Sequence, residues 1–251
     1  MFKLMKYEFR KTWITKLILL GVTAALEIMF LIALYGEFED TLILSVGLLT
    51  AVAMLGVLVI GLESVLTLHR DMNTKQSYML FMTPNSSNKI LGAKVLECSL
   101  SILITGAFFF ALGALDITLL FAKSGTLNQL WDMIQDFLSH FSVAGHELTF
   151  DTATMAALVF NLLTGWIGTV TMAYLADVVS SALLNGKKFN GLLSFALFLF
   201  LSWFTGWITR QATAAITSAM TMLLVDGLIS LAFAAIMYIV TAQIMERKLS
   251  V

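Results

Sequence analysis

Long runs of apolar residues alternate with shorter polar stretches along the whole chain. Each run is close to the 20 or so residues with which an α-helix crosses the hydrocarbon core of a bilayer. Backbone polar groups have no water to bind in lipid, so such runs predict helices rather than open strands. Six segments qualify, and we predict that they span a membrane: Leu17–Tyr35, Leu42–Leu68, Val95–Ala122, Ala153–Leu184, Leu192–Ile208 and Ile216–Ile244.

The composition supports the same conclusion. Of 251 residues, 59% are hydrophobic and 12% are charged, whereas an ordinary soluble domain is about 25% charged. These values exclude a water-soluble globule and an intrinsically disordered chain. A single cysteine excludes a disulfide framework, three histidines argue against a multi-histidine metal site, and a net charge of −1 argues against nucleic acid as a partner. We therefore expect an all-α, polytopic membrane protein with one transmembrane domain over residues 1–251.

The positive charges between the apolar segments predict the orientation of the chain. All but two of the 15 lysines and arginines precede the first segment, follow the sixth, or lie in the connections from the second to the third and from the fourth to the fifth. Lys123 and Arg210 are the exceptions. The positive-inside rule then places both termini in the cytoplasm, as expected for a multi-pass protein of the plasma membrane.

Two stretches outside the spans have the spacing of amphipathic helices. In residues 1–16 and the start of the first span, one face collects Met5, Phe9, Trp13 and Leu17. A basic helix of this kind lies in the membrane interface, and a frayed tail is the alternative. Residues 123–152 are expected outside, where Thr126 and Gln129 match a capping box before an apolar face. A lid over an export path and an inert interfacial helix both fit this second stretch.

Residues 69–94, between the second and third spans, form a cytoplasmic loop that is too long for a simple turn. Tyr78–Met82 is an apolar island in this polar loop, and Pro84 breaks any helix that enters it. Ser86 or Ser87 can then cap a helix leading into the third span. Exposed aromatic side chains on a short helix suit docking into a groove of a partner protein. Insertion of the island into the lipid headgroups is the alternative.

Six carboxylates fall within the predicted spans, whereas no lysine or arginine lies in a span interior. An isolated charge there costs about 2.5–3.5 kcal/mol on insertion scales, which favours protonation, a wet cavity or a cationic guest. We predict that five of the six acids, all except Asp116, line a substrate path. Three lie near the cytoplasmic leaflet, namely Glu63, Glu97 and Asp177, and two lie near the midplane, namely Glu27 and Asp226. The alternative is that each acid is protonated or bonded to a polar side chain of a neighbouring helix.

The sequence lacks the common motifs of nucleotide and hydrolytic sites. It contains no G-x-x-x-x-G-K-[ST], no G-x-G-x-x-G, no H-E-x-x-H and no G-x-S-x-G. We therefore predict that the chain is not an enzyme, has no catalytic or metal-binding residues, and carries no cofactor of its own.

The chain begins Met-x-Lys-x-x-Lys-Tyr-Glu-x-Arg and then has six spans with a cytoplasmic loop between the second and third. This layout resembles the permease subunits of export-type ABC transporters, the ABC-2-type family. The loop follows the pattern of that family at Arg70, Thr74, Gln76, Met79, Leu80, Pro84, Ser86, Ile90, Gly92 and Lys94. It departs from the pattern at Gln76, where the family has Glu, at Asn73, where it has Gly, and at Ala93, which separates Gly92 from Lys94.

The resemblance implies a permease subunit of an ATP-driven exporter of amphipathic or antimicrobial peptides, drugs or lipid-linked sugars. It implies two permease copies, either a homodimer or a pair of close paralogues, and two ABC ATPase subunits that hold ATP and Mg. Residues 76–88 would form the main coupling helix and residues 185–190 a second contact. The implied coupling residues are Gln76, Tyr78, Met79, Leu80, Phe81, Pro84, Ser86, Lys187 and Lys188.

Three other functions remain possible from the sequence. One is the substrate-capture subunit of a vitamin importer, which also has about six spans and borrows an ATPase. Another is a secondary transporter that carries protons on Glu27 and Asp226. The third is an intramembrane enzyme, which would need nucleophile and base residues at matching depths.

Overall fold

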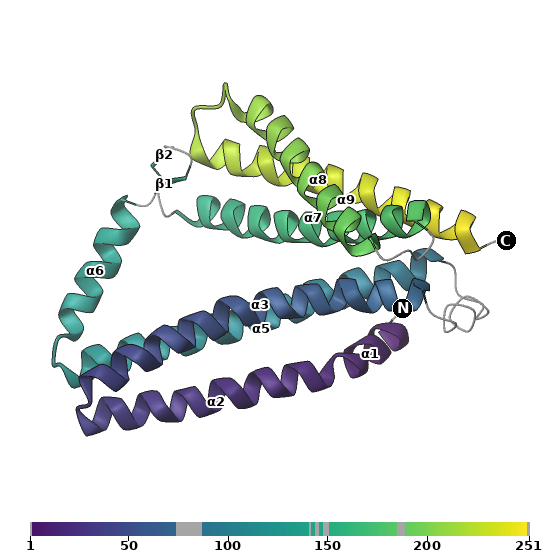
Figure 1. The fold of residues 1–251 in the computed structure, drawn as a ribbon. Coiled ribbons are helices and arrows are strands. Elements are labelled where there is room, and N and C mark those ends of the chain that lie inside the picture. Colours follow the sequence, from purple (N-terminus) through teal and green to yellow (C-terminus); the bar gives the residue numbers. More distant parts are fainter. Residues whose placement is uncertain are drawn as a thin grey trace. The chain divides into compact units, whose positions relative to one another are not determined.

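The computed structural model describes residues 2–73, 87–140, 142–143, 146–147, 151–184 and 189–249. These residues are helical apart from short connections and one antiparallel pair of two-residue strands, β1 (Ser142–Val143) and β2 (His146–Glu147). The helices, shown in Figure 1, are α1 (Phe2–Lys11), α2 (Trp13–Gly36), α3 (Glu39–Asn73), α5 (Ser87–Lys123), α6 (Leu127–His140), α7 (Thr152–Leu184), α8 (Asn190–Thr213) and α9 (Ala219–Leu249).

Six helices in the described part of the chain are long and apolar enough to cross a membrane, which confirms the six predicted spans. They are α2, α3, α5, α7, α8 and α9. The apolar portions of α3 and α5 run to 33 and 36 residues, which is about 50 Å or more at about 1.5 Å per residue. Both exceed the roughly 30 Å of a hydrocarbon core, so these helices tilt in the bilayer or extend beyond it.

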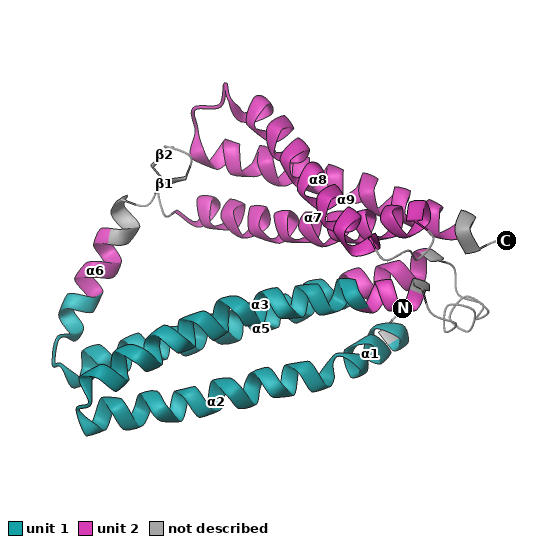
Figure 2. Ribbon diagram, in the orientation of Figure 1, with its two compact units in different colours: residues 1–66, 96–130 teal, residues 67–95, 131–251 magenta. Residues whose placement is uncertain are grey.

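The chain divides into two compact units, coloured separately in Figure 2. Residues 1–66 and 96–130 form unit 1, and residues 67–95 and 131–251 form unit 2. In unit 1, α2, α3 and α5 share a core in which Phe30, Leu34 and Leu49 are buried. Leucines of α5 pack against this core at Leu112, Leu119 and Leu120.

A glycine of α3 lies where the three helices of unit 1 meet. A Cβ atom built on Gly56 of α3 would lie 2.8 Å from Leu19 of α2 and 3.3 Å from Phe109 of α5. Small residues allow helix backbones to approach closely in membranes, where dispersion contacts drive helix association. A larger side chain at Gly56 would therefore require the Leu19 side chain to shift.

Unit 2 is built around α7, which packs along α9 and against α8. Met172 and Leu175 of α7 are buried with Met237 of α9, and Phe198 and Leu201 of α8 pack against them. Nearer the start of α7, Ala157 and Leu223 form a second buried cluster. The apolar positions of three helices thus give unit 2 a core of its own.

The N-terminal region differs from the predicted continuous helix over residues 1–16. Helix α1 ends at Lys11 and α2 begins at Trp13, with Thr12 between them at φ −94° and ψ 4°. Thr12 is buried, whereas Trp13 and Leu17 are 58% and 49% exposed. The predicted continuous helix is therefore wrong at Thr12, whereas contact of Trp13 and Leu17 with the membrane interface stays a prediction.

The helix expected within residues 123–152 is present as α6. Gly125 has a φ of 69°, which lets the chain turn out of α5, and the N–H groups of Gln129 and Leu130 donate to the Thr126 carbonyl. The Thr126 hydroxyl contacts Ser124 at 2.6 Å. Apolar side chains of α6 are exposed to the surroundings at Leu127, Trp131 and Ile134.

Helix α7 starts at an aspartate cap. The Thr154 N–H donates to Oδ1 of Asp151 at 3.1 Å, which satisfies one of the free donors of the first turn. Hydrogen bonds from Thr154 also hold the pKa of Asp151 below its ordinary value. Asp151 is therefore ionised at neutral pH, where its charge suits the helix N-terminus.

Candidate functional site

The predicted coupling residues lie outside the described residues. They fall in residues 74–86 and 185–188, for which the structure gives no placement. This set comprises Gln76, Tyr78, Met79, Leu80, Phe81, Pro84, Ser86, Lys187 and Lys188. The five predicted path carboxylates are described. Glu27, Glu63 and Glu97 belong to unit 1, and Asp177 and Asp226 belong to unit 2.

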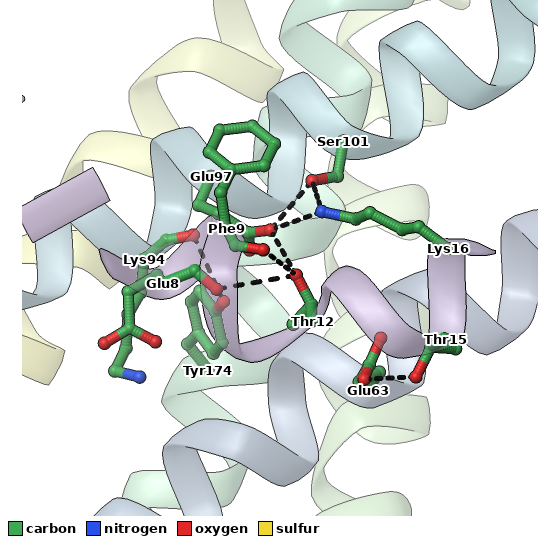
Figure 3. Close-up of polar contacts among 10 residues, drawn as sticks. All are labelled: Glu8, Phe9, Thr12, Thr15, Lys16, Glu63, Lys94, Glu97, Ser101 and Tyr174. Carbon is green, nitrogen blue, oxygen red and sulfur yellow. Dashed lines mark hydrogen bonds and ion pairs between the residues drawn. The ribbon is translucent and has the colours of Figure 1, made fainter. Parts of the chain in front are cut away.

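Glu97 lies in a buried polar cluster between the start of α2 and the first half of α5, shown in Figure 3. Lys16 Nζ lies 2.9 Å from Glu97 Oε1 and 2.7 Å from the Ser101 hydroxyl. The hydroxyls of Thr12 and Ser101 donate to the same carboxylate oxygen at 3.1 and 2.8 Å. Lys16 also lies 4.3 Å from the centroid of the Phe9 ring. Three hydrogen bonds and one aromatic ring thus converge on one ion pair.

The expectation that the acids of the spans lack a basic partner is therefore wrong at Glu97. Helix α2 begins at Trp13, four residues before the predicted start of the first span at Leu17. Lys16 consequently belongs to the helix, and its long side chain reaches α5. Glu97 is only 3% exposed, so the ammonium and the two hydroxyls replace the water that a buried carboxylate loses.

Glu63 contacts the same turn of α2. The Thr15 hydroxyl donates to Glu63 Oε1 at 2.6 Å. Thr12 directly precedes α2, and Thr15 and Lys16 lie in its first turn. Figure 3 shows that these residues contact both α3 and α5. The first turn of α2 is therefore the polar junction of unit 1.

Glu27 meets a carboxyl group that the sequence did not assign to the path. Its side chain interacts with that of Asp116, so the contact joins α2 to α5. Asp116 therefore belongs with Glu27 as one site.

Asp177 also has a basic partner. His69 Nδ1 lies 2.8 Å from Asp177 Oδ1, joining the end of α3 to α7 in unit 2. Sequence reasoning missed the pair, because His69 lies at the edge of a predicted loop and 108 positions from Asp177.

A second ion pair in unit 2 is more deeply buried. Lys94 Nζ lies 2.7 Å from Asp71 Oδ2, and these side chains are 2% and 9% exposed. The Tyr174 hydroxyl donates to the Lys94 carbonyl at 3.3 Å. Asp71 lies two residues before the end of α3, Lys94 seven residues after the start of α5 and Tyr174 ten residues before the end of α7. The contacts therefore join the three helices near these ends. We call Asp71, Lys94, Tyr174, His69 and Asp177 the helix-end cluster.

The end of α7 is also joined to the start of α8. The Ser180 hydroxyl lies 2.6 Å from the Asn190 carbonyl oxygen and bonds the Asn190 side chain as well. The Asn190 amide donates to the Ser181 hydroxyl at 3.0 Å. All three residues are buried. Both ends of the stretch that contains Lys187 and Lys188 are therefore fixed to each other.

Asp226 lines a cavity of about 350 Å³ between α7, α8 and α9 of unit 2. Its Oδ2 accepts a hydrogen bond of 2.8 Å from the Asn161 amide. Arg210 lines the same cavity, together with hydroxyl-bearing residues such as Ser202, Thr205 and Ser230. The cavity thus combines both signs of charge with neutral polar groups. The sequence predicted a site at Asp226 but assigned Arg210 only to an external connection.

Comparison of the chain with protein-family models, with curated proteins and with solved structures finds no match. The six helices and their contacts are therefore known from the structure alone. The resemblance to exporter permeases rests on the sequence motifs and stays a prediction.

Proposed function

We propose that the chain is the transmembrane permease subunit of an ATP-driven ABC exporter. The observation that carries the proposal is the helix-end cluster together with the contacts of Ser180 and Asn190. These contacts join the helix ends that flank residues 74–86 and 185–188, which are the two stretches that the sequence motifs assign to ATPase contact. The helix ends that enter and leave both stretches belong to unit 2.

The physical reason is the transmission of force. A loop pushed by a partner moves a helix bundle only if its ends are firmly attached to that bundle. Separating a buried ion pair leaves charges without compensation and costs several kcal/mol. The Asp71–Lys94 and His69–Asp177 contacts therefore hold the end of α3 and the start of α5, which belong to unit 2, to α7.

The remaining parts of the proposal come from the sequence. Both termini lie in the cytoplasm, α1 lies in the membrane interface, and the protein resides in the plasma membrane. A second permease copy and two ATPase subunits complete the exporter, with ATP and Mg on the ATPases. The five carboxylates form the substrate path, and an amphipathic peptide or a drug is the substrate.

A proton-coupled secondary transporter is the second candidate function. The neighbouring carboxyl groups of Glu27 and Asp116 favour it, because carboxyl groups are the usual side chains that bind and release protons in transporters. A substrate-capture subunit of a vitamin importer gains no such support from the described residues.

Purification of the protein with its ATPase tests the leading proposal. We expect a complex of two permeases and two ATPases by mass measurement in detergent. Transport into inverted vesicles should stop on addition of vanadate and continue with an uncoupler. A permease that transports without any ATPase, or transport that an uncoupler abolishes, would contradict the exporter and favour the secondary transporter.

Replacing Glu63 by Gln and Asp177 by Asn should weaken export of a cationic compound more than that of a neutral one. The amides keep the shapes and the hydrogen bonds to Thr15 and His69 but remove the negative charges. Resistance to the two compounds would be measured side by side, with Asp132→Asn on α6 as the control. Equal loss for both compounds would assign these acids a packing role.

A further inference from the structure

The cavity of unit 2 changes in character along its length. Its polar lining lies near the connection between α8 and α9, and includes Thr209, Arg210 and Asp226. Arg210 lies three residues before the end of α8, and Asp226 lies seven residues after the start of α9. At about 1.5 Å per residue, they lie about 5 and 10 Å from these helix ends. The polar part is therefore at the depth of lipid headgroups and the first carbons below them.

The other end of the cavity is more apolar, although Thr169 also lines it. Phe233 and Met237 of α9 line it together with Met172 of α7. Met237 follows Asp226 by eleven residues, which is about 16 Å further along the helix. The cavity thus runs from a charged region near the membrane surface to an apolar region near the middle of the bilayer. A volume of about 350 Å³ falls within the usual range of ligand sites, about 300–1,000 Å³.

The two charges in the polar part lack ionic partners in the described part of the chain. Asp226 has the neutral amide of Asn161 as its partner. No carboxylate of the described residues lies within ion-pair distance of Arg210, and its side chain is exposed. The charge of Asp226, about 10 Å from the helix end, is costly in a bilayer unless it is paired or hydrated. A bound group with a cation and an anion would compensate both charges at once.

We propose that this cavity binds a phospholipid with a zwitterionic ethanolamine headgroup, from the leaflet on the side of the α8–α9 connection. Its phosphate binds Arg210, whose guanidinium suits phosphate oxygens. Its ammonium donates to Asp226, and one acyl chain lies along Met172, Phe233 and Met237. The head lies at the surface and the chain points to the middle, as in a lipid of that leaflet. This proposal does not depend on the exporter function.

Two glycines allow a direct test of occupancy. Gly165 of α7 and Gly206 of α8 both line the cavity, and a Cβ atom built on either would meet no atom within 4 Å. A large side chain at Gly206 would therefore fill the cavity without clashing with the protein. Gly113 of α5 is equally open and lies in unit 1, outside this cavity, which makes Gly113→Leu the matched control.

The experiment is native mass spectrometry of the full chain, purified from nanodiscs that contain phosphatidylethanolamine and phosphatidylglycerol in equal amounts. We expect the wild-type chain to retain phosphatidylethanolamine in preference to phosphatidylglycerol, which lacks the ammonium. Asp226→Asn and Arg210→Gln should each reduce retention by about 10- to 100-fold, the loss of one charge-assisted hydrogen bond. Gly206→Leu should abolish retention, whereas Asp132→Asn and Gly113→Leu should leave it unchanged.

Several results would overturn the proposal. Equal retention of the two lipids by the wild-type chain would show that the headgroup charges are not recognised. Unchanged retention in Gly206→Leu would place the lipid elsewhere, and no retention by the wild-type chain would leave the cavity filled by water. If Gly206→Leu instead lowers the mass of the protein from two chains to one, the surface is a contact between copies. Should a charge variant fail to fold, Gly206→Leu still decides the outcome, because it removes no polar group.

Discussion

Replacing Lys94 by Met should lower the free energy of unfolding by about 3–5 kcal/mol, the usual cost of removing one partner of a buried ion pair. The substitution keeps most of the apolar stem of Lys94 but removes the ammonium. Asp71 would then be left with its carboxylate in a buried place and without its partner at 2.7 Å. Unfolding of the purified protein in detergent, followed by circular dichroism against temperature or denaturant, measures the loss.

Two variants make this expectation specific. Lys89→Met, on the same helix but at an exposed position, should change stability by less than about 1 kcal/mol, as is usual for exposed charges. Lys94→Met combined with Asp71→Leu should recover much of the loss, since an apolar pair of similar volume often replaces a buried ion pair without penalty. If Lys94→Met unfolds like Lys89→Met, the ion pair contributes little and the helix ends are held by packing alone.

Replacing Tyr78, Leu80 and Phe81 together by Ser should abolish transport and remove the ATPase from the purified complex. Truncating one aromatic anchor at an interface costs about 2 kcal/mol or more. Loss of two aromatic anchors and a leucine should therefore weaken the complex until the ATPase no longer co-purifies. Membrane insertion should be unchanged, because the six spans lie outside this segment. The readouts are the amount of ATPase that co-purifies and the rate of ATP-dependent export.

The matched control replaces three apolar residues at a different place. Leu127, Trp131 and Ile134 of α6 are exposed apolar side chains. Their replacement by Ser should leave ATPase binding intact. If the variant at residues 78–81 keeps the ATPase and full transport, docking is wrong. The apolar island would then be a segment that inserts into lipid headgroups.

The number and approximate places of the spans were predictable from sequence, because burial in lipid requires long apolar runs whatever the packing. The partner of Glu97 was not. Lys16 precedes the apolar run, and its role follows from where α2 begins and how it packs on α5. The break at Thr12 was missed for a similar reason, since Met5, Phe9, Trp13 and Leu17 keep a helical spacing across it.

The cavity was only partly predictable. An acid in a span marks a functional position by its cost alone, and this reasoning identified Asp226. The places of Arg210, Ser202 and Ser230 in the cavity depend on which faces of α8 and α9 meet α7. The sequence alone does not determine these faces. Glycines at 165 and 206 were the available signal, since small residues in a span often mark a close approach or an opening.

The contacts between Ser180, Ser181 and Asn190 bear on how the chain is made at the ribosome. The joined residues are only nine or ten positions apart, so they can meet as soon as the start of α8 has been synthesised. Contacts between near neighbours in sequence form early, because little loop entropy is lost in closing them. We therefore expect α7 and α8 to enter the membrane as a preassembled helical hairpin, onto which α9 docks later.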